Sequence, residues 1–105
     1  MINKLRKMLG LGPATDYKKL IAEGAIVLDV RTKGEYSQGH VKGSLNIPLD
    51  QLESGIQKLK NKETPIITCC ASGMRSASAK SILKGKGYTQ VYNGGSWTRV
   101  GQFAK

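Results

Sequence analysis

A loop at residues 70–76 carries the residues best suited to chemistry in this 105-residue chain. It follows an apolar, β-branched stretch at 65–68 that predicts a buried strand, and it precedes a stretch at 76–86 that predicts a helix. A cysteine at such a turn, here Cys70, faces backbone N–H groups and the positive end of the helix dipole. Arg75 adds a permanent cation, so the loop is suited to a thiolate or to an anion attached to it.

The rest of the chain alternates between predicted strands and predicted helices. We expect helices at 15–23, 33–39 and 50–60, strands at 25–30, 45–47 and 90–92, and a helical turn at 96–100. The spacings Thr32-x-x-Glu35 and Asp50-x-x-Glu53 are those of capping boxes, which mark helix starts. This alternation predicts an α/β fold with parallel strands joined by right-handed crossovers.

The carboxyl ends of parallel strands gather at one edge of a sheet, where such folds place their functional crevice. Four strand ends should therefore share one rim, at Arg31, Pro48, Cys70 and Asn93. Asp29 interrupts an otherwise apolar strand, and a buried carboxylate needs hydrogen-bond donors because leaving it unpaired is costly. Nearby backbone amides or Arg31 are the obvious donors.

Three blocks of the chain resemble single-domain rhodaneses. The pattern Cys70-x-x-Gly73-x-Arg75-Ser76 is similar to the active-site loop of that family. The stretch from LDVR at 28–31 to GHVKGSLNIP at 39–48 is similar to its first half, and GY followed by VYNGG within 87–95 is similar to its end. The resemblance implies a rhodanese-like α/β domain at 15–105, in which a small open parallel β-sheet has helices on both faces.

The resemblance also implies an activity, the transfer of a sulfane sulfur in two steps. Cys70 would attack thiosulfate, or a persulfide or polysulfide donor, and its persulfide would then give the sulfur to a thiol or to cyanide. Arg75 would help to hold the anion. The resemblance assigns the remaining roles as follows: the persulfide-binding loop is Ala71, Ser72, Gly73, Met74 and Ser76, and the structural support is Asp29, Arg31 and Glu35. It implies no cofactor and no metal.

Two other interpretations of the loop stay open. Counted from Cys69, the spacing Cys-x5-Arg is that of cysteine phosphatases, whose longer loop accommodates phosphate. Thr68 and Gly73 fit that register poorly and favour Cys70 as the nucleophile, with Cys69 a small buried residue. The other interpretation is a non-catalytic rhodanese module used for binding, which the presence of Cys70 and Arg75 disfavours.

Composition limits the partners and the compartment. Seventeen lysines and arginines against seven acidic residues give a formal net charge of +10, which attracts small anions. The lysines are scattered without an aromatic platform, so we expect no specific nucleic acid. Two adjacent cysteines form no disulfide framework, which predicts a reducing compartment such as the cytoplasm, with the periplasm as the alternative if a signal peptide was removed. We expect a monomer.

Three further features invite functional interpretations: the segment 1–14, His40 and Met74. Residues 1–14 predict a short amphipathic helix and a linker, with no apolar run long enough to span a membrane. His40 is the only histidine, and we predict a hydrogen-bonded turn residue rather than a general base or a metal ligand. Met74 has two open interpretations, an exposed side chain or a pocket wall.

Overall fold

The computed structural model describes residues 15–104, so the helix and linker predicted at 1–14 lie outside the described residues. Its centre is a four-stranded sheet in the order β2-β1-β3-β4, with every neighbouring pair parallel. The strands are β1 (Ile26–Asp29), β2 (Leu45–Asn46), β3 (Ile66–Cys70) and β4 (Val91–Ser96). This arrangement confirms the predicted small parallel sheet.

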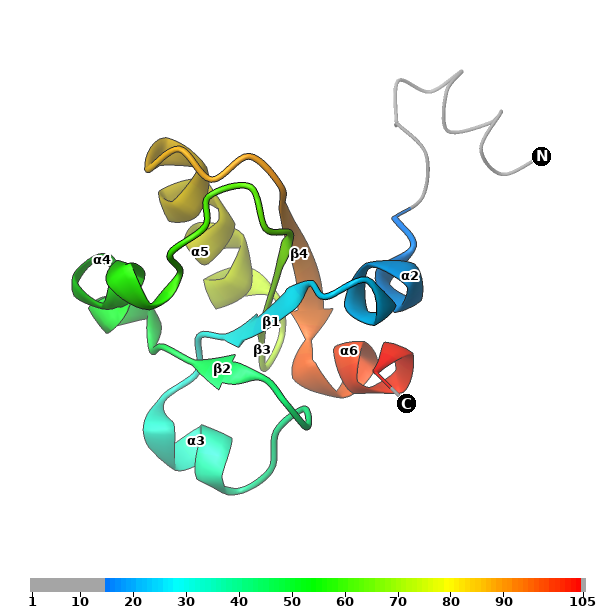
Figure 1. Cartoon of the computed structure of the whole chain (residues 1–105). Coiled ribbons are helices and arrows are strands. Elements are labelled where there is room, and N and C mark those ends of the chain that lie inside the picture. The colour runs from blue at the N-terminus through cyan, green and yellow to red at the C-terminus, as the bar shows by residue number, and fades with distance from the viewer. Residues whose placement is uncertain (1–14, 105) are drawn as a thin grey trace, which may run out of the picture.

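Helices cover both faces of the sheet, as predicted (Figure 1). On one side lie α4 (Leu52–Gly55) and α5 (Met74–Gly85), and on the other lie α2 (Tyr17–Ala22) and α6 (Trp97–Phe103). Successive strand residues point to opposite faces, so β1, β3 and β4 each contribute side chains to two separate cores.

The two cores differ in size. The larger contains Leu28, Ile66 and Cys70 from the strands together with Leu83 from α5. The smaller contains other strand residues, among them Cys69, packed with Val100 of α6. Burying one such aliphatic side chain contributes about 1.5–3 kcal/mol. With both faces covered, the loops that follow the carboxyl ends of the strands carry the predicted site residues.

The single helix predicted at 50–60 is instead three short pieces. These are η1 (Leu49–Gln51), α4 and η2 (Ile56–Lys58), and neither η1 nor α4 has a side-chain N-cap, so the second predicted capping box is wrong. The interruption falls at Gly55, where a Cβ would lie 3.1 Å from Cγ2 of Ile47. Close packing thus favours a glycine at this position, and glycine is a poor helix former.

The other capping box is present. The Thr32 hydroxyl accepts from the backbone N–H of Glu35, and the Glu35 carboxylate accepts from the N–H of Thr32, at the start of α3 (Lys33–Ser37). At the far end of the chain, β4 continues through Ser96 instead of turning out at 93–95, and Ser96 caps α6. The helical turn predicted there is two turns long.

Replacing Gly94 by alanine should destabilise the fold by about 1–3 kcal/mol through overpacking. A Cβ there would lie 2.6 Å from Val100 Cγ2 and 2.8 Å from Ile67 Cγ2. Urea unfolding measures the effect. Gly85→Ala is the matched control, since nothing lies within 4 Å of its Cβ, and it should be neutral or stabilising by up to about 1 kcal/mol. Equal stability of the two variants would contradict the predicted crowding at Gly94.

Candidate active site

The predicted loop connects the carboxyl end of β3 to the first turn of α5 (Figure 1). Cys70 is the last residue of β3, and Met74 is the first of α5. Between them Gly73 has a φ of +104°, in the left-handed region that favours glycine. This backbone conformation closes a tight turn over the cysteine.

The turn directs backbone N–H groups at the Cys70 sulfur. Gly73 N lies 3.0 Å from Sγ, Ser76 N lies 3.4 Å away, and Ser76 Oγ lies 3.5 Å away. Burial raises the pKa of the Cys70 thiol, but hydrogen bonds from Ser76, Gly73 and Ser72 outweigh burial, so its pKa is lowered from the usual 9.0. The loop is therefore built to hold a thiolate.

Asn93 of β4 fixes the shape of this loop, a role that the sequence analysis missed. Its Oδ1 accepts from the Ser76 hydroxyl at 2.6 Å and from Gly95 N at 3.0 Å, while its Nδ2 donates to the Gly73 carbonyl at 3.2 Å. On β3, the Thr68 hydroxyl donates to the Ser76 carbonyl at 2.8 Å. The one available signal was the position of Asn93 at the predicted rim.

Arg75 pairs with Glu35 across the rim. Its two terminal nitrogens lie 2.6 and 3.0 Å from the two carboxylate oxygens, and each side chain is 36% exposed. Hydrogen bonds from Arg75 and from the Thr32 backbone lower the pKa of Glu35 to about 2. The positive charge of Arg75 is therefore balanced by a carboxylate before any ligand arrives.

Asp29 and Arg31 form a buried ion pair beneath the rim. The Arg31 Nη2 atom lies 2.7 Å from Asp29 Oδ2, and the two side chains are 4% and 0% exposed, respectively. Arg31 also donates to the carbonyls of Glu35 and Gly39, and its guanidinium lies 4.5 Å from the centre of the Trp97 ring. The pair thus ties β1 to α3, the helix that carries Glu35.

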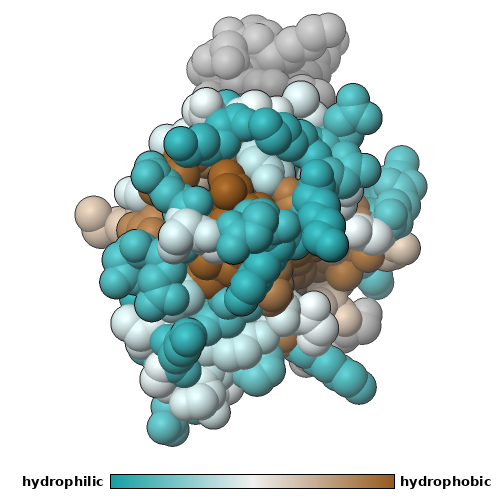
Figure 2. Space-filling model, turned by 60° about the vertical axis from the view of Figure 1, so that its left-hand side comes forward, coloured by the Kyte–Doolittle hydropathy of each residue, from teal (hydrophilic) through white to brown (hydrophobic). Residues whose placement is uncertain are grey.

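A cavity of about 300 Å³ opens beside the loop. Its lining residues come from the ends of β1 and β2, from η1 and from α5: Val30, Thr32, Pro48, Leu49, Asp50 and Arg75. Figure 2 shows apolar surface ringed by hydrophilic side chains on the side of the molecule that carries α4.

The remaining predicted loop residues, Ala71, Ser72 and Met74, are exposed. Met74 is 79% exposed, which resolves its two interpretations in favour of an exposed side chain.

The other two chemical candidates lie apart from the loop. Cys69 is fully buried among the residues that pack on α6, and burial raises its pKa to about 12. His40 Nδ1 lies 2.8 Å from the Tyr36 carbonyl oxygen, and its ring stacks on Tyr36. Both residues have the surroundings of structural groups. Within residues 15–104 no cluster of three His, Cys, Asp or Glu side chains is placed to hold a metal ion.

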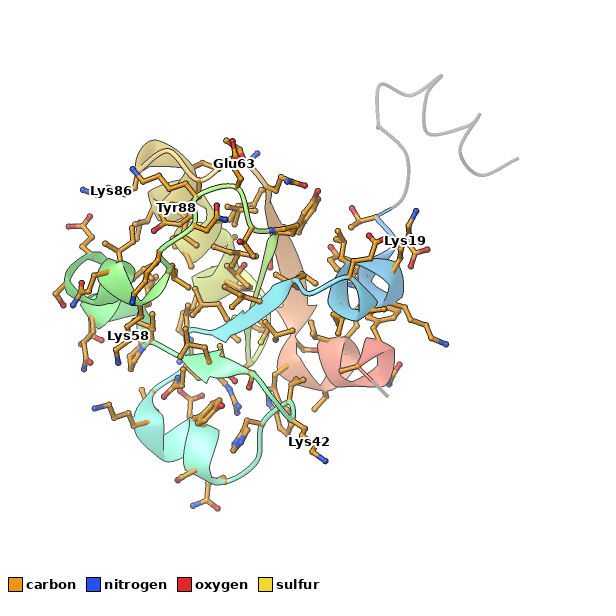
Figure 3. The ribbon with its side chains drawn as sticks, viewed as in Figure 1. Lys19, Lys42, Lys58, Glu63, Lys86 and Tyr88 are labelled. Atoms are coloured by element: carbon orange, nitrogen blue, oxygen red, sulfur yellow. The ribbon has the colours of Figure 1, made fainter. Side chains whose placement is uncertain are left out.

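The lysines labelled in Figure 3 lie apart from one another. Lys19, Lys42, Lys58 and Lys86 point outward from separate parts of the molecule (Figure 3). In the described part of the chain, no helix combines the length and the apolar character that crossing a membrane requires.

Comparisons with known proteins agree on one family. The family model described as the rhodanese-like domain matches residues 13–98. The thiosulfate sulfurtransferase PspE of Escherichia coli (strain K12) is 39% identical over 69 residues, 65% of this chain and 66% of that protein. The rhodanese domain-containing protein CG4456 of Drosophila melanogaster is 38% identical over 91 residues, 72% of this chain and 81% of that protein. The chain is 35% identical over 69 residues to YqhL of Bacillus subtilis (strain 168), and it spans only 54% of the length of that protein.

Solved structures show the same similarity. A structure titled "rhodanese with anions from E. coli" superposes with a TM-score of 0.68 at 35% identity, covering 72% of this chain and 91% of the other. The human single-domain sulfurtransferase TSTD1 superposes with a TM-score of 0.66 at 30% identity, covering 78% of this chain and 86% of the other.

Proposed function

Because this chain belongs to the family of rhodanese-like domains, we propose that it is a sulfurtransferase that carries a sulfane sulfur on Cys70. One observation supports this assignment above all others. The loop amides converge on Cys70 Sγ, with Gly73 N at 3.0 Å and Ser76 N at 3.4 Å. Such donors stabilise an anion at the end of β3, which both a thiolate and a persulfide require.

The first step loads the sulfur. The Cys70 thiolate attacks the outer sulfur of thiosulfate, the S–S bond of thiosulfate breaks, and its electron pair leaves with sulfite. Cys70 is then a persulfide, Cys–S–S⁻, and the charges balance because a thiolate and a dianion have become a persulfide anion and sulfite dianion. A persulfide or polysulfide donor loads the enzyme in the same way with a thiolate or shorter polysulfide as the leaving group.

The second step unloads it. A thiolate or cyanide attacks the outer sulfur of the persulfide, the S–S bond breaks, and the Cys70 thiolate returns to the loop. The acceptor leaves as a persulfide or as thiocyanate. Since the loop amides face an anion at every stage, they need no rearrangement during the cycle, which is the condition for efficient electrostatic stabilisation. Arg75 and the loop residues 71–76 complete this anion site in our proposal.

The enzyme is proposed to act as a monomer in a reducing compartment such as the cytoplasm. Cys69 and Cys70 are both free, and neighbouring strand residues point to opposite faces of the sheet, so the two do not form a disulfide with each other.

Intact-mass measurement tests the proposal directly. Incubation with thiosulfate should add the mass of one sulfur to the protein and release one equivalent of sulfite, and cyanide should then remove that mass as thiocyanate. Polysulfide is the second donor to try. If neither donor adds sulfur to the folded protein, the proposed function is wrong.

The pH dependence of loading follows from the lowered pKa of Cys70. The attacking species is the thiolate, whose fraction rises with pH up to the pKa and is constant above it. An ordinary thiol with a pKa near 9 gains about tenfold in thiolate per pH unit below that value. We therefore expect the loading rate with thiosulfate to reach its plateau at a lower pH. A rate that still rises tenfold per unit around pH 8 would contradict this prediction.

A further inference from the structure

The cavity beside the loop has an apolar half and a charged half. Val30, Pro48 and Leu49 supply the apolar side, while Asp50 and Arg75 supply the charges. It lies beside the loop that holds Cys70, because one of its lining residues, Arg75, is followed in the chain by Ser76, whose amide contacts Sγ. A thiol acceptor that reaches the loop from this side would place its body in the cavity.

The charges of this cavity run against those of the chain as a whole. Arg75 is held by the Glu35 carboxylate in a two-point contact, so its charge is balanced locally. Asp50 is exposed, and within residues 15–104 it makes neither an ion pair nor a side-chain hydrogen bond. Asp50, Arg75 and the Glu35 carboxylate paired with Arg75 therefore carry one net negative charge together, in a chain of formal charge +10.

A helix-capping role does not account for the presence of the Asp50 carboxylate at the cavity. It lies in η1, which has only three residues and no side-chain N-cap, so the dipole available to its carboxylate is small. An unpaired carboxylate beside an apolar wall is instead a group that a ligand cation can satisfy.

Resting on the proposed function, we infer that this cavity holds the body of the sulfur acceptor, and that Asp50 selects thiols carrying a cationic amine close to the sulfur. Pro48 and Leu49 contact the carbon chain of the acceptor, and Asp50 faces its ammonium group. The acceptor thiolate attacks the outer sulfur of Cys–S–S⁻, the S–S bond breaks, and the products are the acceptor persulfide anion and the Cys70 thiolate.

Electrostatics gives the reason for this selection. An acceptor attacks as a thiolate, so it brings a negative charge toward a persulfide anion. An ammonium group makes an aminothiolate neutral overall and attracts it to Asp50, whereas a carboxylate makes the acceptor a dianion that Asp50 repels. A charge interaction at an exposed site such as Asp50 changes a rate by about 1.5- to fivefold.

The test begins with protein already loaded with sulfur, so that loading and acceptor choice are measured separately. Two acceptors of nearly equal shape are compared, cysteamine with an ammonium group and 2-mercaptoethanol with a hydroxyl, and the second-order rate of sulfur removal is measured for each. Asp50→Asn should reduce the preference for cysteamine by about 1.5- to fivefold relative to the wild type. Taking the ratio between proteins cancels the different intrinsic reactivities of the two thiols.

Two control variants make the result specific. Asp50→Glu keeps the charge and should retain the preference. Glu53→Gln removes an equally exposed carboxylate that does not line the cavity, and it should leave the preference unchanged. If loaded Asp50→Asn shows the wild-type preference, the inference about the acceptor is wrong and the sulfurtransferase proposal stands. If the wild type takes up no sulfur from either donor, both are wrong.

Discussion

Cys70→Ser should abolish sulfur uptake and reduce the turnover of thiosulfate with cyanide by more than about 10³-fold. A serine hydroxyl at this position remains protonated at neutral pH. Within residues 15–104 the one histidine, His40, contacts the Tyr36 carbonyl and does not lie against residue 70 as a general base. A serine also cannot form a persulfide. Sulfur uptake is read by intact mass, and turnover by the thiocyanate produced.

Cys69→Ala is the matched control for this experiment. The Cys69 side chain points to the opposite face of the sheet, is fully buried, and has a pKa raised to about 12. Removing its sulfur should leave uptake within about twofold of the wild type, because an uncharged, buried thiol is a poor nucleophile. A circular dichroism melt shows whether each variant is folded.

The opposite pattern would change the functional assignment. Sulfur uptake that is lost in Cys69→Ala but kept in Cys70→Ser would move the nucleophile to Cys69. If the folded wild type takes up no sulfur, hydrolysis of a phosphate ester with Cys69 of the Cys-x5-Arg register as nucleophile is the next assay. A folded wild type with neither activity would favour the binding module. The wild type and the two variants together therefore discriminate among all three interpretations of the loop.

Much of the site was predictable because its signals are local. Cys70, Gly73 and Ser76 lie within one strand-to-helix turn, and the geometry of that turn follows from the order of the two elements. The capping box of Thr32 and Glu35 is equally local, and it is present as predicted. The burial of Asp29 and the need for a nearby donor followed from its place in an apolar strand.

Contacts between distant parts of the chain were not predictable. Glu35 and Arg75 are 40 residues apart, and Asn93 lies 17 residues beyond Ser76, so only the register of the sheet brings them together. The extent of β4 was misjudged for a similar reason. Asparagine and glycine are depleted in strands, but Gly94 lies where Val100 and neighbouring groups leave no room for a Cβ. Tertiary packing thus overrode the local preference.

Asp29→Asn should destabilise the protein by about 3–5 kcal/mol, because it leaves the buried Arg31 guanidinium without its counter-ion. In the wild type, Asp29 accepts from Nε and Nη2 of Arg31 and from its backbone N–H, at distances of 2.7–3.0 Å. The two side chains are 0% and 4% exposed, so water cannot replace the lost carboxylate. The free energy of unfolding in urea measures the effect.

A double variant distinguishes the cost of an unpaired buried charge from the cost of changing side chains at these two positions. Replacing both partners, as in Asp29→Leu with Arg31→Met, removes the buried charges together, and such replacements are often close to neutral in stability. We therefore expect the double variant to be more stable than Asp29→Asn, although Arg31 also loses its contacts with Gly39 and Trp97. A loss of no more than about 1 kcal/mol for Asp29→Asn, the value of an exposed pair, would show that the pair is not buried as described. Arg31 also donates to the carbonyl of Glu35 in α3, and the Glu35 carboxylate pairs with Arg75. Loss of the Asp29–Arg31 pair should therefore loosen α3, and sulfur uptake should fall together with stability.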